Sequence, residues 1–111
     1  MEINAISTDR KLLLELTGEL DHQGAAQAIR ELELALDAAL PLHLALDLSG
    51  VTFMDSSGIG VLLNRYKQMK AGHTSFYGAC PQVMRVLKVA GILGLMHQYE
   101  SKEEAIYSRE V

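Results

Sequence analysis

The amino-acid sequence predicts an α/β fold, in which a mixed β-sheet is flanked by four α-helices in the order ββαβαβαβα. Two observations support this prediction. First, two apolar runs near the N-terminus flank the turn-like residues Thr8-Asp9-Arg10, which indicates a β-hairpin. Second, beyond residue 20 short apolar runs alternate with segments of helical periodicity, as in chains that form parallel strands.

The first half of the chain is expected to hold the hairpin, one helix and one buried strand. The hairpin strands are placed at residues 2–7 and 11–17. An alanine-rich helix follows and ends at Pro41, and its apolar residues share one face at spacings of three and four: Ile29, Leu32, Leu36 and Leu40. The apolar run 43–48 is typical of a parallel strand that is buried on both faces.

The second half is expected to alternate helices and strands. In order, we place a helix over 57–71 that is closed by Gly72, a strand over 74–79, a helix from Pro81 to Gly91, a short strand over 95–99 and a helix over 101–109. Ser101 and Glu104 have the spacing of a capping box, which opens the last helix. Residues 1–111 are therefore expected to form one domain.

Composition excludes several classes of function. The net charge of −4 argues against a partner that is nucleic acid or an anionic membrane surface. The single cysteine, Cys80, cannot form an internal disulfide, and no Cys/His cluster indicates a metal site. The N-terminus lacks the pattern of a signal peptide, and no apolar run reaches the ~20 residues of a membrane span. We expect a cytoplasmic protein.

Residues 51–60, VTFMDSSGIG, place an acid, two hydroxyls and a glycine between a strand and a helix. A hydrolase could use Ser56 or Ser57 as a nucleophile, but Met54 replaces the first glycine of a G-x-S-x-G elbow and the four histidines are isolated. A nucleotide loop is also weakly supported, because Leu63 replaces the third glycine of G-x-G-x-x-G and no Walker lysine follows. An enzyme is the least favoured interpretation.

A third interpretation treats the helix as a recognition surface. Its core face is expected to carry five apolar residues: Ile59, Leu62, Leu63, Tyr66 and Met69. The opposite side is expected to carry an outward stripe, flanked by Gly60 and Arg65, whose members are Ser57, Val61, Asn64 and Gln68. An exposed valine among small polar residues suits a partner interface, although an ordinary helix surface explains the pattern equally well.

A phosphate on Ser57 would turn this helix start into a switch in principle. It would add about −1.5 to −2 charge, which a helix N-terminus tolerates at little cost to the fold. Asp55 lies two residues away, and Asp21 would lie nearby if residues 18–21 form a loop at the same sheet edge. The resulting negative patch would repel a partner while the fold survives. The spacing alone does not establish that the site is used.

Three segments resemble the anti-sigma factor antagonists of the sporulation sigma-F type, which are STAS-domain proteins. They are LTGELDH at 16–22, LDLSGVTFMDSSGIGVLLNRYKQMK at 46–70 and AGILGLMHQYESKEEAI at 90–106. The resemblance covers essentially the whole chain and implies a single STAS domain, with a mixed sheet and four helices.

The resemblance implies a binding protein that needs no cofactor of its own. An unphosphorylated family member binds an anti-sigma factor that is also a serine kinase, and so releases the sigma factor. The kinase uses ATP to phosphorylate the second serine of DSSG, here Ser57, and a membrane-bound serine phosphatase removes the phosphate. Together, the stripe and the resemblance predict these partner-binding residues: Asp21, His22, Asp55, Ser56, Ser57, Gly58, Gly60, Val61, Asn64, Arg65 and Gln68.

The chain departs from the family pattern at two places. Gln23 and Gly24 follow His22 where the family often has GELDHHT, and Asn64 replaces a common glycine. These differences affect the choice of partner. Two alternatives also stay open: a STAS regulator of another partner-switching pathway, or a STAS module that binds a nucleotide.

Overall fold

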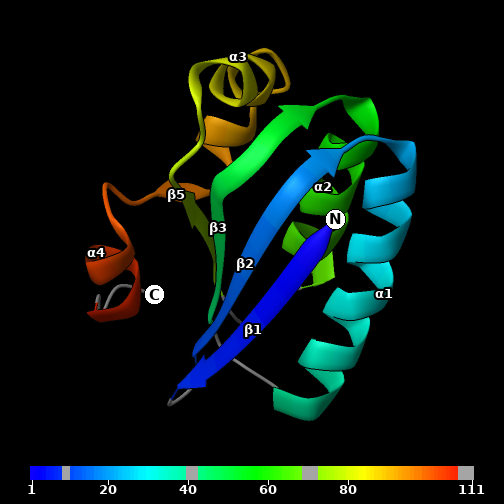
Figure 1. Ribbon diagram of the computed structural model, residues 1–111. Helices are drawn as coiled ribbons and strands as arrows, with labels where there is room; N and C mark the ends of the chain where they lie inside the picture. The colour runs from blue at the N-terminus through cyan, green and yellow to red at the C-terminus, as the bar shows by residue number, and fades with distance from the viewer. Residues whose placement is uncertain (9–10, 40–42, 69–72, 108–111) are drawn as a thin grey trace.

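The computed structural model describes residues 1–8, 11–39, 43–68 and 73–107, and within them one five-stranded sheet carries the fold (Figure 1). Its strands lie in chain order: β1 (Glu2–Thr8), β2 (Lys11–Leu20), β3 (His43–Met54), β4 (His73–Tyr77) and β5 (His97–Gln98). β1 pairs antiparallel with β2, and each later strand pairs parallel with the one before it. The sheet is therefore mixed, as predicted.

Four α-helices and one 3-10 helix connect or follow these strands: α1 (His22–Ala39), α2 (Ser56–Gln68), α3 (Pro81–Val89), η1 (Ile92–Gly94) and α4 (Lys102–Tyr107). In Figure 1, α1 and α2 lie side by side against one face of the sheet, and α4 lies on the opposite side. α3 packs near the end at which β3 finishes. The predicted element order ββαβαβαβα is confirmed, with η1 as an addition.

Alternating residues of the central strands pack into two apolar clusters, one on each face of the sheet. The larger cluster lies on the side of α1 and α2 and includes Leu12, Leu14, Leu44 and Leu46. The smaller one, on the other face, joins Leu13, Ala45, Tyr77 and Tyr99 to Ala105 of α4. The central strands are thus buried on both faces, as their continuous apolar sequence predicts.

Two strands extend further than their apolar runs indicate. β2 continues to Leu20 and β3 to Met54, because residues 17–20 pair with residues 50–54; the register shifts once before Thr17 and once between Gly18 and Glu19. Backbone hydrogen bonds along this ladder outweigh the weak strand preference of its glycines and polar residues. Residues 18–20, which we expected in a loop, are therefore strand.

Helix termini mostly follow their local signals. At α4, the Glu104 N–H donates to Ser101 Oγ (3.1 Å), and Glu104 Oε1 accepts from the Glu100 N–H (3.1 Å). The serine cap is as predicted, while the returning bond reaches one residue earlier than in the standard capping box. Gly91 lies beyond α3 with a φ of 77°, which favours glycine.

Some predicted features differ from the structure or fall on residues that it does not describe. β5 is limited to two residues of the predicted strand 95–99, because η1 occupies the chain just before it. The turn at residues 9–10 and the helix ends at Pro41, Gly72 and Arg109 fall outside the described residues. In the described part of the chain, no helix is both long and apolar enough to cross a membrane.

Candidate functional site

Two aspartates begin α1 and α2 at the carboxyl ends of neighbouring parallel strands. Asp21 follows β2, and its Oδ1 accepts a hydrogen bond from the Gly24 N–H (2.9 Å). Asp55 follows β3, and its Oδ1 accepts one from the Ser57 N–H (2.9 Å). Both are N-caps, which satisfy helix donors that lack a partner within the helix. The pairing of residues 20 and 54 places the two caps at one edge of the sheet, as the Asp21 prediction required.

Glycines allow both helices to begin close to the strands. A Cβ on Gly58 would lie 2.8 Å from Met54 Cγ and 3.0 Å from Leu20 Cβ. A Cβ on Gly24 would lie 2.0 Å from the carbonyl oxygen of Glu19. Gly24, which we linked to partner choice, therefore has a packing role. Gly58 is also buried, so it cannot offer a partner its surface as we predicted.

The two serines occupy the first two positions of α2. Ser56 is exposed and Ser57 is half-buried. The Ser57 N–H is held by Asp55, the acid that begins the helix. The backbone dipole at a helix start favours negative charge, so this position can hold an anion without disturbing the helix.

The predicted outward stripe is wrong at Val61, whose side chain is only 1% exposed and belongs to the larger core. Because Gly58 packs on Leu20 and Met54, the inward face of α2 is formed by Gly58, Val61 and Leu62. Ile59 and Leu63, predicted as core, are only partly buried.

The exposed row of α2 consists of Ser56, Gly60 and Asn64, with half-buried Ser57 beside it. His22 and Gln23 are exposed at the start of the neighbouring α1. Arg65 and Gln68 lie within α2, but their side chains fall outside the described part. The structure thus brings the caps, the serines and the exposed row to one end of the molecule.

A shallow groove of about 410 Å³ separates α2 from α3, and sequence reasoning missed it. It is lined by Ser56, Ile59, Arg85, Val86, Val89 and Ala90. The side chain of Val89 is 91% exposed. The exposure of Val89, though not the groove itself, had a signal in the sequence, because Val89 follows Arg85 by four residues and so continues the polar side of an amphipathic helix.

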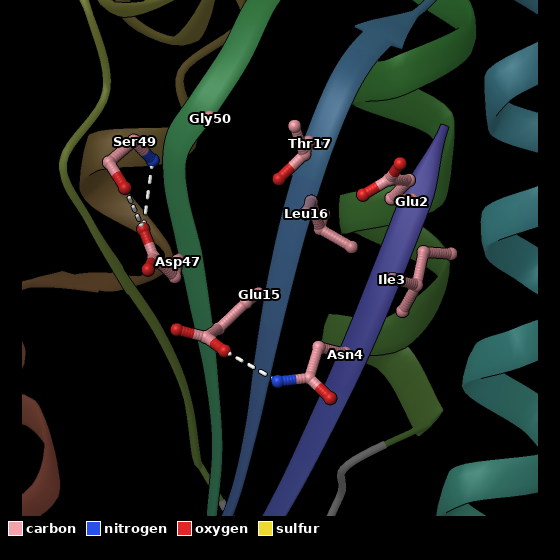
Figure 2. Close-up of a pocket in the computed structure, with 9 residues that line it drawn as sticks. All are labelled: Glu2, Ile3, Asn4, Glu15, Leu16, Thr17, Asp47, Ser49 and Gly50. Atoms are coloured by element: carbon pink, nitrogen blue, oxygen red, sulfur yellow. Dashed lines mark hydrogen bonds between the residues drawn. The ribbon is translucent and has the colours of Figure 1, made fainter.

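A second cleft, of about 310 Å³, lies on the sheet face opposite α1 and α2 (Figure 2). Asn4 Nδ2 donates to Glu15 Oε1 (2.8 Å), and Lys102 Nζ forms an ion pair with Glu15 Oε2 (3.2 Å). Asp47, 8% exposed, accepts bonds from the N–H and Oγ of Ser49 (2.9 and 2.5 Å). Carboxylates of Glu2, Glu15 and Asp47 line the cleft, which disfavours a nucleotide phosphate there.

Tyr77 is buried on the same sheet face, opposite Asp47 in the β3–β4 register. Its burial, followed by the influence of the Asp47 carboxylate, raises the pKa of the phenol above its ordinary value. Among the described residues, no three His, Cys, Asp or Glu side chains are grouped to hold a metal ion.

A mixed sheet with helices that begin at acidic caps, and two serines at the start of α2, is consistent with the fold of a STAS domain. The chain belongs to the STAS domain family, whose profile matches residues 2–105. The anti-sigma F factor antagonist of Paenibacillus polymyxa is 34% identical over 102 residues, or 90% of this chain and 87% of the relative. That of Lysinibacillus sphaericus is 31% identical over 101 residues, or 89% and 86%.

Solved structures agree with this assignment. The anti-sigma factor antagonist SpoIIAA in its unphosphorylated form is 28% identical, with a TM-score of 0.81 over 95% of this chain and 93% of that one. The Bacillus cell fate determinant SpoIIAA in the phosphorylated form is 27% identical, with a TM-score of 0.73 over 95% and 96%. The predicted resemblance is confirmed, and these names are those of regulatory binding proteins, in line with a chain that is not an enzyme.

Proposed function

We propose that this protein is a cytoplasmic anti-sigma factor antagonist of the sporulation type, controlled by phosphorylation of Ser57. The unphosphorylated form binds an anti-sigma factor that is also a serine kinase, and the sigma factor is released. The kinase then transfers the γ-phosphoryl group of ATP to the Ser57 hydroxyl, and a serine phosphatase restores the active form by hydrolysis. The position of Ser57 at the start of α2, two residues after the capping Asp55 and beside the exposed row, is the observation that carries the proposal.

In the proposed switch, one phosphate ends binding without unfolding the domain. Ser57 is outside the inward face of α2, so Gly58, Val61 and Leu62 keep their contacts when the hydroxyl is modified. The added charge of about −1.5 to −2 is stabilised by the helix start. When a partner approaches, however, the negative charge of the phosphate adds to that of the Asp55 and Asp21 carboxylates, which increases the repulsion. The phosphate must also be desolvated for the partner to pack against it.

Relatives support the same reading. Two are named as anti-sigma F factor antagonists, and SpoIIAA is known in both unphosphorylated and phosphorylated forms. The partner surface we propose consists of Asp21, His22, Asp55, Ser56, Ser57, Gly60 and Asn64. Arg65 and Gln68 continue the same helix and are proposed as further contacts.

Incubation with the anti-sigma factor kinase of its own cell and ATP, followed by mass spectrometry, tests this function. We expect one phosphate, on Ser57, with none on the Ser57→Ala variant and one on the matched Ser56→Ala variant. Calorimetry should then show tight binding of the unphosphorylated chain and a loss of roughly thirtyfold or more after phosphorylation, since disruption of a desolvated charged contact costs about 2–5 kcal/mol. Phosphate on Ser56, or unchanged affinity after phosphorylation, would contradict the mechanism.

A further inference from the structure

The groove between α2 and α3 adjoins the serines but has a different chemical character. Ser56 contributes to both the groove and the exposed row of α2. The other lining side chains are aliphatic apart from Arg85, and they come from the first turn of α2 and from the last turns of α3 and its C-cap, Ala90. The groove is thus continuous with the Ser57 surface.

Val89 is the most exposed of the large apolar side chains in the described residues, at 91%. Leu93 and Leu95, in and just after η1, are exposed as well. The segment from α3 to η1 therefore offers water three apolar side chains within seven residues. Exposed apolar groups gathered next to a concave surface are a mark of interaction sites.

The surface around Ser57 is too polar to anchor a partner by itself, so a stable interface there requires an adjacent apolar site. Its exposed members are polar or lack a side chain, as in His22, Ser56, Gly60 and Asn64. Stable protein interfaces bury about 800 Å² per partner and draw most of their energy from a few well-packed side chains in pockets. A partner that covers Ser57 over such an area extends beyond the polar residues and reaches α3.

We propose that the groove holds an apolar side chain of the anti-sigma factor. Val89 and Ile59 then anchor the partner, while the phosphorylation state of Ser57 determines whether the partner can bind. This inference rests on the proposed function and divides its surface in two. The groove supplies affinity in both states of Ser57, and the charge at Ser57 decides whether the partner can approach. Continuity through Ser56 favours this occupant over a second copy of the chain.

Opposite charges at Val89 test the anchor. Val89→Glu and Val89→Lys are each expected to weaken binding of the unphosphorylated protein to its own anti-sigma factor by roughly tenfold or more, measured by calorimetry. Because Val89 is almost fully exposed, neither variant should change the urea midpoint of unfolding appreciably. A decrease with one sign of charge and an increase with the other would indicate electrostatics and overturn an apolar anchor.

Leu34 provides the matched control. It is 68% exposed on α1, about 18 Å along that helix from its start by the rise of 1.5 Å per residue. Leu34→Glu and Leu34→Lys should bind as the parent chain does. Equal loss at both positions would overturn the groove as the site of the effect.

The remaining outcomes distinguish failure of the groove proposal from failure of the proposed function. If the parent chain binds and both Val89 variants bind equally well, the groove proposal fails and the proposed function stands. If the parent chain binds no anti-sigma factor of its cell, both fail together. Two measurements detect other occupants of the groove. If sedimentation of the free protein shows a dimer that Val89→Glu dissociates, the groove is occupied by a second copy of the chain. If native mass spectrometry shows a bound small apolar ligand, the groove is occupied by that ligand, and either result overturns the proposal.

Discussion

Single residues in α2 have opposite roles although they are close in sequence. Gly58 and Gly60 are two positions apart, yet a Cβ on Gly58 would meet Met54 and Leu20, while one on Gly60 would meet nothing within 4 Å. The first glycine is required by the approach of helix to strand. The second is an exposed position at which glycine only lowers the stability of the helix.

Alanine at these glycines should therefore change the free energy of unfolding in opposite directions. Gly58→Ala is expected to destabilise by about 1–3 kcal/mol, because Met54 and the Leu20 backbone must shift. Gly60→Ala is expected to stabilise by up to about 1 kcal/mol through helix propensity. Urea denaturation measures both. Equal effects would show that neither packs as described.

At the scale of elements, the orientation of α2 determines which side chains a partner can contact. The helix turns Val61 inward and Asn64 outward, although both were predicted on one stripe. Placing Val61 in the core leaves a smaller, more polar row beside Ser57. In the interface we propose, the apolar contribution comes from Ile59 at the start of α2 and from Val89 of α3.

Truncation of the two side chains measures this orientation. Val61→Ala should lower the free energy of unfolding by about 2 kcal/mol, the scale expected for removing two buried methyl groups. Asn64→Ala should leave stability within about 0.5 kcal/mol, since the side chain is exposed. If Val61→Ala proved neutral to folding but harmful to partner binding, the original outward stripe would be restored.

For the molecule as a whole, the sequence predicted the fold class and the start of α4, but not which side of α2 faces the core. Capping is local, so Asp55 and Ser101 could be recognised from their neighbours. The orientation of Val61 could not, because it depends on Gly58 meeting Leu20 from another strand. The groove likewise depends on the positions of two helices that are separate in the sequence, α2 and α3, so no short pattern contains it.

The dependence of the stability of the whole molecule on alkaline pH tests the burial of Tyr77. Its folded-state pKa is raised above the ordinary value of 10.0, whereas the unfolded chain ionises near that value. The folded state therefore binds more protons above pH 10, and stability should fall with rising pH by up to ~1.4 kcal/mol per unit from this group. Below pH 10 the phenol is protonated in both states and contributes no slope.

Urea titrations between pH 9 and 11 on the parent chain and Tyr77→Phe isolate this effect. The lowered pKa of buried Lys11 acts in the opposite sense, raising stability as pH approaches 10.5, and is common to both proteins. The difference between the two curves should therefore grow above pH 10. Parallel curves would mean that Tyr77 ionises as readily in the folded protein as in the unfolded one.

Lys11 also connects distant parts of the sequence. Its Nζ donates to the carbonyl oxygens of Ala105 and Ile106 at the end of α4, while its backbone opens β2. During translation, β2 emerges some ninety residues before those carbonyls do. Until then the sheet face of Leu13 and Ala45 lacks its cover, and a nascent chain paused before α4 should be captured by chaperones that recognise exposed apolar strands.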